Sequence, residues 1–241
     1  MTIWHKILNF ILPPRCVICG KILPEDKGLC DTCIREIEFL KSPVCHRCGQ
    51  PLGEVAAEDN VHLLCGQCLQ NKRKPFRLSR SAFAYDDFSK KLILDFKFYD
   101  HTELASLLAK MMFVAGNEIF KSGVDVIIPV PLHYTRLIWR KYNQSSLLGK
   151  ELSELTGIEV NNSVLRKIRR TKSQVECKGF ARLKNLQGAF GVKNGQLIKG
   201  KRVLLIDDVL TTGSTLKECT QVLKHAGAKS VDWLTVARTS I

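Results

Sequence analysis

Eight of the ten cysteines fall into four pairs with the same two-residue gap, and no other feature restricts the fold of this 241-residue chain as strongly. The pairs are Cys16/Cys19, Cys30/Cys33, Cys45/Cys48 and Cys65/Cys68. A two-residue gap lets two thiolates point at one metal ion from a single tight turn. Eight such thiolates predict two tetrahedral sites of four cysteines each.

Disulfides are the alternative use of these cysteines. The apolar stretch near the start has helical spacing but no small-residue cleavage site, so we do not interpret it as a signal peptide. In a reducing compartment, thiolates bind metal instead of pairing. We therefore expect two structural zinc ions, each supplying on the order of 10 kcal/mol of folding energy. Pairing in sequence order around each ion is the simplest arrangement, and a cross-braced arrangement of alternate pairs stays open.

The rest of the chain alternates between strand-like and helix-like segments. We expect strands within 79–87, 124–132, 202–207 and 229–238, and helices at 88–98, 103–120, 143–157 and 214–227. This alternation predicts an α/β fold with a parallel sheet and helices on both faces. We place a zinc-binding module at residues 1–75, ending in a linker at 69–75, and an α/β body at 76–241. The basic segment 166–187 is expected to be irregular.

The stretch RVLLIDDVLTTGSTLKE, residues 202–218, contains the most specific chemistry. Asp207 and Asp208 come at the carboxyl end of an expected central strand, where parallel sheets bind their ligands. The chain then enters a helix, whose free first amides attract an anion. Hydroxyl side chains add donors, and a glycine lets the backbone approach a phosphate. The phosphate loop consists of Thr211, Thr212, Gly213, Ser214 and Thr215.

An acidic pair beside a cradle for one phosphate suits a ribose 5-phosphate, because carboxylates accept hydrogen bonds from sugar hydroxyls. A Walker-type loop would need a lysine before the Ser/Thr, and a dinucleotide fingerprint would need three spaced glycines. The stretch contains neither pattern. The remaining alternative is that the two aspartates only cap a loop.

The segment VLLIDDVLTTGST resembles the phosphoribosyl pyrophosphate (PRPP) motif of type I phosphoribosyltransferases. Three more segments, IIPVPLHYTRLIWRKYNQSSLLG, RTKSQ and RLKNLQGAF, are similar to those of the ComF family of bacterial competence proteins, ComFC in particular. The paired cysteines also resemble this family, in which they form an N-terminal double zinc ribbon. One departure is Lys141, where the family usually has glycine.

The resemblance implies a type I phosphoribosyltransferase-like body and assigns roles within it. Asp207 and Asp208 would bind the ribose hydroxyls of PRPP, the phosphate loop its 5-phosphate, and magnesium would bridge ligand oxygens. The pyrophosphate would face the loop around Pro129 to His133. The mobile loop that closes over substrate would lie within 166–184, which has eight Lys/Arg against one acid. Candidates in these two loops are Pro131, Arg136, Arg140, Lys141, Arg170 and Arg182. No catalytic residue is assigned.

Positive charge points to polyanionic partners. The net charge is +14, of which +12 falls on residues 76–241. The resemblance implies a role in natural transformation (DNA uptake), on single-stranded DNA in the cytoplasm, alongside competence or DNA-processing proteins. A position near the inner membrane is compatible with this, although no run of residues is apolar enough to span a bilayer. Trp139, Tyr142 and Phe180 are candidates for stacking on bases.

Three functions are compatible with these observations. The first is a competence-associated protein that binds PRPP and single-stranded DNA. The second is an active phosphoribosyltransferase with an unknown base or amine acceptor. The third is a zinc-dependent interaction protein with a vestigial pocket.

Overall fold

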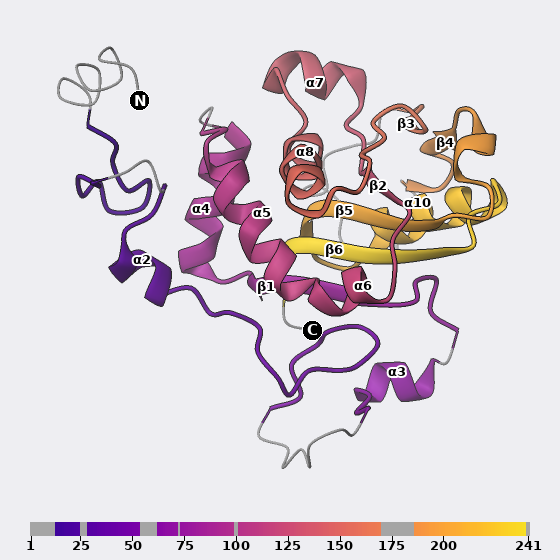
Figure 1. Ribbon diagram of the computed structural model, residues 1–241, viewed down its shortest axis with the longest axis horizontal. Helices are drawn as coiled ribbons and strands as arrows, with labels where there is room; N and C mark the ends of the chain where they lie inside the picture. The colour runs from indigo at the N-terminus through magenta and orange to yellow at the C-terminus, as the bar shows by residue number, and fades with distance from the viewer. Residues whose placement is uncertain are drawn as a thin grey trace.

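The computed structural model describes residues 13–24, 28–53, 62–71, 73–98, 101–169 and 186–239. At its centre lies a parallel sheet with the strand order β1-β6-β5-β2 (Figure 1). The strands are β1 (Ser79–Ala84), β2 (Val126–Pro129), β5 (Arg202–Leu210) and β6 (Ser230–Arg238). Because all four run in the same direction, their carboxyl ends meet at one edge of the sheet, where such folds bind ligands.

Alternate residues of β5 face opposite sides of the sheet, as the period of two in a strand requires. Leu204 and Ile206 belong to one apolar core, whereas Val203 and Leu205 belong to another. All four side chains are fully buried. The continuous apolar run in the sequence therefore reflects a strand that is covered on both faces.

Helices cover the two faces. The first core contains apolar residues of α4 (Asp87–Phe98), α5 (Leu104–Ala115) and α8 (Gln144–Thr156). The second core contains Leu216, Cys219 and Leu223 of α10 (Ser214–His225). This arrangement confirms the predicted α/β class. None of the helices within the described ranges has the length and apolar character needed to cross a membrane.

One predicted helix is wrong in its extent. The segment 103–120 forms two helices, since α5 ends before Gly116 and α6 (Asn117–Lys121) begins after it. A β-carbon at Gly116 would lie 2.9 Å from the Phe120 side chain and 3.0 Å from that of Leu234 in β6. The chain passes close to the sheet at this point, and glycine provides the space.

The basic segment predicted to be irregular is ordered at its beginning. Arg166 and Lys167 belong to β3 (Leu165–Lys167), which pairs antiparallel with β4 (Phe190–Val192). The short 3-10 helix η1 (Gly195–Ile198) follows β4. Residues 170–185, including the predicted substrate-loop residues Arg170 and Arg182, lie outside the described residues.

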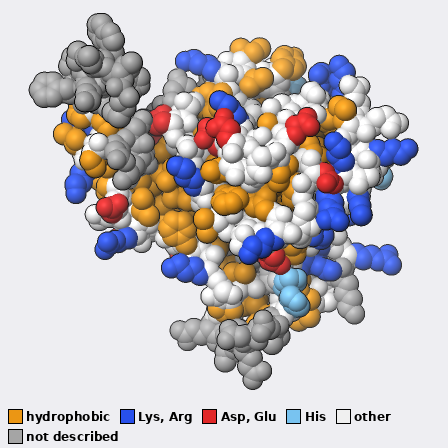
Figure 2. Space-filling model, in the orientation of Figure 1, with side chains coloured by type: hydrophobic (Ala, Val, Ile, Leu, Met, Phe, Trp, Pro, Cys, Tyr) orange, Lys and Arg blue, Asp and Glu red, His pale blue; other side chains and the backbone are white. Residues whose placement is uncertain are grey.

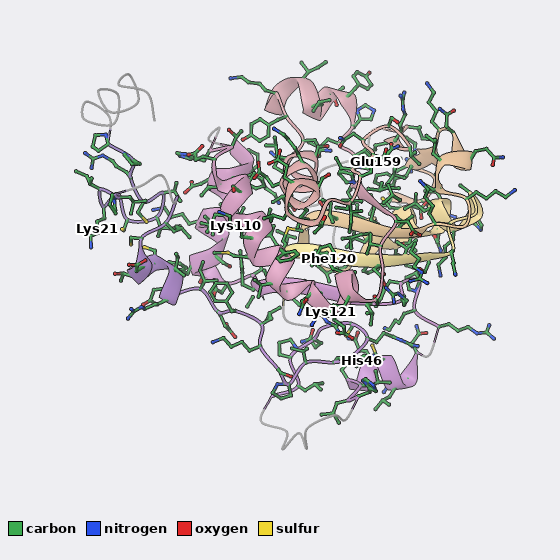
Figure 3. All side chains as sticks on the ribbon, viewed as in Figure 1. Lys21, His46, Lys110, Phe120, Lys121 and Glu159 are labelled. Atoms are coloured by element: carbon green, nitrogen blue, oxygen red, sulfur yellow. The ribbon has the colours of Figure 1, made fainter. Side chains whose placement is uncertain are left out.

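The cysteine-rich region packs against the body. It contains the short helices α2 (Asp31–Arg35) and α3 (Gly66–Gln70), and it shares the first apolar core with α4 and α5 through residues such as Leu29 and Ile37. Phe39 forms a backbone bridge with Phe83 of β1. On the other side, His46 lies 3.4 Å from Glu118 of α6, near the labelled Lys121 (Figure 3). Apolar packing on the body therefore adds to whatever energy the metal supplies.

Candidate functional site

The eight paired cysteines form two clusters, and the clusters follow sequence order. Within each cluster, all four sulfur atoms lie within 4.8 Å of one another. Cys19 Sγ lies 3.7 Å from Cys30 Sγ, and Cys48 Sγ lies 3.6 Å from Cys65 Sγ. Sulfurs bound to one zinc ion at about 2.3 Å in a tetrahedron are separated by about 3.8 Å. The donor set and its spacing fit structural zinc, with the first and second pairs in one site and the third and fourth in the other.

Tight turns build both clusters. The amide of Gly20 donates to the carbonyl of Cys16, and that of Gly49 donates to the carbonyl of Cys45, each at 2.8 Å. Both glycines have the positive φ that such turns favour. Although burial opposes ionisation, nearby backbone amides outweigh it and lower the pKa of Cys16 and of Cys45 to about 6. These shifts favour the thiolate forms of Cys16 and Cys45, and the thiolate is the form that binds metal.

The acidic pair lies within β5, three residues before its end. Asp207 Oδ1 accepts hydrogen bonds from Ser145 Oγ at 3.0 Å and from the amide of Asp208 at 2.9 Å. Asp208 Oδ2 lies 2.9 Å from Lys97 Nζ, and the Asp208 side chain is only 15% exposed. Both acids are half-buried, and each has a side-chain partner on a neighbouring helix.

Lys97 and Ser145 are site residues that the sequence did not suggest. Lys97 stands in the last turn of α4 and Ser145 in the first turn of α8. The start of α8 holds the end of α4 in place, since Gln144 Nε2 donates to the Lys97 carbonyl at 3.1 Å. Ser145 lies inside NQSSLLG, part of the family-like sequence, whereas the sequence offers no signal for Lys97.

The pKa of Asp207 is shifted by its burial and by the carboxylate next to it. Burial, followed by the neighbouring Asp208 carboxylate, raises the pKa of Asp207 from 3.8 to about 7. The Asp208 amide, Lys97 and Ser145 oppose the shift without cancelling it. Near neutral pH, Asp207 is consequently divided between its protonated and ionised forms, and a cation or a set of hydroxyl donors would favour the ionised form.

The phosphate loop joins β5 to α10. Gly213 has φ 71° and precedes the helix without any side-chain cap of the first turn. Thr212 Oγ1 and Ser214 Oγ lie 2.8 Å apart at the same helix start. A β-carbon at Gly213 would lie 3.3 Å from the Trp233 ring, so glycine provides both the conformation and the space. The free amides at the start of this twelve-residue helix, with two hydroxyl groups beside them, suit the binding of one phosphate.

The loop after β2 contains the pyrophosphate candidates. Pro131 lies two residues after the end of β2, and Asn143 Nδ2 donates to the carbonyl of Val130 between them at 3.0 Å. Arg136 and Arg140 lie in α7 (Tyr134–Arg140), but their side chains are outside what the structure describes. Lys141 ends this helix with φ 65°. The family glycine at this position is explained by that left-handed conformation, which the lysine adopts at a cost.

Of the three aromatic candidates for stacking, one is described. The Tyr142 hydroxyl donates to the carbonyl of Phe96 at 3.1 Å, which ties the segment between α7 and α8 to α4. This is a packing role, in agreement with the half-buried ring. The Trp139 side chain and Phe180 lie outside the described residues.

Two known domains match this chain. A double zinc ribbon domain matches residues 7–69, and a phosphoribosyl transferase domain matches residues 120–240. The fold and its two kinds of site thus define a protein with a phosphoribosyltransferase domain and a double zinc ribbon ahead of it.

Three relatives span nearly the whole chain. Competence protein F of Haemophilus influenzae is 30% identical over 93% of this chain and 96% of its own. DNA utilization protein YhgH of Escherichia coli K12 is 31% identical over 95% and 98%. Competence protein ComFC of Bacillus subtilis is 26% identical over 90% and 87%. The chain belongs to the ComF family of competence proteins, as its sequence motifs predicted.

Proposed function

We propose that this protein binds PRPP with magnesium at the carboxyl edge of its sheet. The observation that carries the proposal is the acidic pair of β5 beside an uncapped helix start with hydroxyl side chains. The 5-phosphate would accept hydrogen bonds from the amides of Gly213 and Ser214 and from the loop hydroxyls. The ribose hydroxyls would donate to Asp207 and Asp208.

Ligand binding would rearrange the partners of the acidic pair. In the structure, Lys97 forms an ion pair with Asp208, and Ser145 donates a hydrogen bond to Asp207. Ribose hydroxyls would take the place of the Lys97 ammonium, which would then be free to meet a phosphate oxygen. Magnesium, which prefers oxygen ligands, would neutralise the pyrophosphate from a position held mainly by ligand oxygens. The pyrophosphate itself would lie toward Pro131 and the start of α7.

Isothermal titration with PRPP and magnesium tests this proposal. Asp208→Asn should weaken binding about 10- to 100-fold, because a hydrogen bond to a charged group contributes about 1.5–3 kcal/mol. Asp125→Asn is the matched control, since Asp125 is exposed and lies just before β2, at the opposite edge of the sheet. Equal affinities for the parent and the Asp208 variant would disprove the assignment.

We further propose that the protein binds single-stranded DNA in the cytoplasm during DNA uptake, together with other competence or DNA-processing proteins. The relatives named competence protein F and DNA utilization protein support a DNA-related role. The +12 excess on residues 76–241 supplies the charge. Figure 2 shows Lys and Arg side chains gathered along the right-hand edge of the molecule, from the region of β4 down to that of α3.

Fluorescence anisotropy with a labelled single-stranded oligonucleotide over a salt series tests the DNA proposal. The logarithm of the affinity should fall linearly with the logarithm of salt concentration, with a slope of about −0.7 per phosphate contacted. An absence of binding even at about 0.05 M salt would end this part of the proposal. It would leave PRPP binding, which is measured separately, unaffected.

Turnover of PRPP is the second candidate function, and the match to a phosphoribosyl transferase domain favours it. Loss of pyrophosphate builds positive charge on the ribose, which the partly ionised Asp207 beside it would stabilise. Pyrophosphate release with magnesium and a panel of bases and amines is the test. An Asp207→Asn variant that releases pyrophosphate as fast as the parent would exclude this role for the residue.

A further inference from the structure

A cavity lies between the second cysteine cluster and α10. Its volume is ≈ 470 Å³, which is within the range of sites for small molecules. One wall comes from Cys48, Cys65 and Gly66 of the cluster and α3, and the opposite wall comes from Thr211 to Gly213 of the phosphate loop. We call it the junction cavity. Neither Asp207 nor Asp208 lines it, so it lies on the other flank of the phosphate loop from the acidic pair.

The junction cavity is lined by cations. Arg73, Lys74, Lys217 and Arg238 line it, and no aspartate or glutamate is among the described residues that do so. Zinc bound by four thiolates would leave a charge of −2 at the neighbouring cluster, which offsets only part of these four positive charges. An anionic ligand would remove the remaining mutual repulsion of the cations.

Two buried polar atoms in the cavity wall have no hydrogen-bond partner within the described part of the chain. They are Ser79 Oγ and Arg238 Nε, on side chains of residues that are 1% and 3% exposed. The other Arg238 nitrogens are used, since Nη1 donates to the Cys48 carbonyl at 2.5 Å and Nη2 to Gln50 Oε1 at 2.6 Å. A buried donor without a partner costs about 1–3 kcal/mol. Both atoms are covered in the ligand-free structure, so a ligand acceptor would remove this cost only after a small movement of the Arg238 or Ser79 side chain.

An apolar floor completes the cavity. Phe76 and Trp233 both line it, with ring centroids 4.2 Å apart. The indole N–H of Trp233 already donates to Thr220 Oγ1 at 2.7 Å, so the ring offers only carbon surface here. A nucleobase stacks on aromatic carbon, and its carbonyl groups accept from buried donors. A phosphate binds at a rim of cations.

We propose that the junction cavity binds one nucleotide of a single-stranded nucleic acid, with its phosphate near Lys74 and Lys217 and its base toward Arg238. This inference rests on the single-strand binding proposed above. The inference places the single-stranded nucleic acid beside the phosphate loop, away from Asp207 and Asp208, which are proposed to bind the ribose of PRPP. The second cysteine cluster thereby forms half of a nucleic-acid site.

A variant that fills the cavity separates this idea from general surface charge. Gly66 lines the cavity, and a β-carbon there would meet nothing within 4 Å. Gly66→Phe should lower the affinity for a 5′-hydroxyl single-stranded oligonucleotide of about 20 nucleotides at least about 10-fold by anisotropy, the order expected for loss of one stacked base. PRPP affinity by titration should not change. Zinc content near two per chain reports that the fold is intact.

A charge variant tests the same site if the filled variant does not fold. The double variant Lys74→Ala/Lys217→Ala should make the plot of log affinity against log salt concentration less steep. Its slope should change by about one unit more than in the control double variant. The control is Lys224→Ala/Lys229→Ala, which removes the same charge from two exposed lysines outside the cavity, one of them also on α10.

Three results would overturn the proposal. One is a folded Gly66→Phe protein that binds the oligonucleotide as the parent does. Another is an equal loss of oligonucleotide and PRPP binding, which would make the cavity part of the sugar-phosphate site. The third is identical salt slopes for the two lysine pairs. A parent protein that binds no oligonucleotide would remove this inference together with the DNA proposal, while its PRPP titration would still decide the sugar site.

Discussion

Replacing Asp207 with asparagine should make the ligand-free protein more stable while weakening PRPP binding. Burial, together with the Asp208 carboxylate beside it, raises the pKa of Asp207 to about 7. An acid whose pKa is higher in the folded than in the unfolded protein destabilises the fold as it ionises. The destabilisation begins as pH rises through the unfolded value of 3.8 and is complete above the folded value of about 7.

The size of the effect follows from the shift. One pKa unit corresponds to about 1.4 kcal/mol, so a rise from 3.8 to about 7 sets a ceiling of about 4 kcal/mol at alkaline pH. The side chain is half-buried, and solvent screening lowers the true value, so we expect about 1–2 kcal/mol. Asparagine Oδ1 can still accept from Ser145 and from the Asp208 amide. For a chain of this size, the midpoint of thermal unfolding should rise by roughly 3–6 °C.

Scanning calorimetry of the parent and of Asp207→Asn at about pH 8 and about pH 5.5 measures this difference. The advantage of the variant should fall by about half at the lower pH, because less of the ionisation cost is then present. Titration with PRPP and magnesium should show affinity at least about 10-fold weaker. Asp125→Asn should change neither quantity. A variant that melts at or below the parent at about pH 8 would refute the argument from burial.

Three other substitutions have defined outcomes. Lys97→Ala removes the partly buried partner of Asp208 and should lower thermal stability by about 1 kcal/mol; calorimetry that shows no change would mean that the ion pair is not formed in solution. Lys141→Gly relieves a residue with φ 65° and should stabilise the protein by up to about 1 kcal/mol in urea unfolding, whereas destabilisation would contradict the left-handed conformation. Cys45→Ser should reduce the bound zinc from two ions per chain to one by atomic absorption; two retained ions would show that Cys45 does not hold zinc.

The sequence predicted the sheet well because its central strands are buried on both faces. Such strands are continuous apolar runs, and RVLLID could not be placed on a surface. The break at Gly116 could not be read in the same way. Glycine is tolerated within a helical pattern, and only the approach of Phe120 and Leu234 shows why the helix ends there.

The candidate site could be predicted where it is continuous in sequence and not where it is assembled from distant segments. Asp207, Asp208 and the phosphate loop follow one another along the chain. Ser145 contacts Asp207 from 62 positions earlier in the chain, and Lys97 contacts Asp208 from about 110 positions earlier. A lysine near a helix end is ordinary, so nothing in the sequence indicated its role. The cysteine pairing was open on spacing alone, because both arrangements use the same turns.

The two cysteine clusters support opposite sides of the sheet edge that holds the candidate site. The first cluster packs beside α4, where Lys91 Nζ donates to the Ile18 carbonyl at 2.6 Å, and the last turn of α4 holds Lys97 against Asp208. Arg238 donates to the Cys48 carbonyl of the second cluster and pairs in register with Leu210, the last residue of β5 before the phosphate loop. Loss of metal from the first cluster should therefore displace the acidic pair first. Loss of metal from the second cluster should displace the phosphate loop and the walls of the junction cavity. The first zinc site would thus act on PRPP binding without contacting the ligand, because it supports α4, whose last turn holds Lys97.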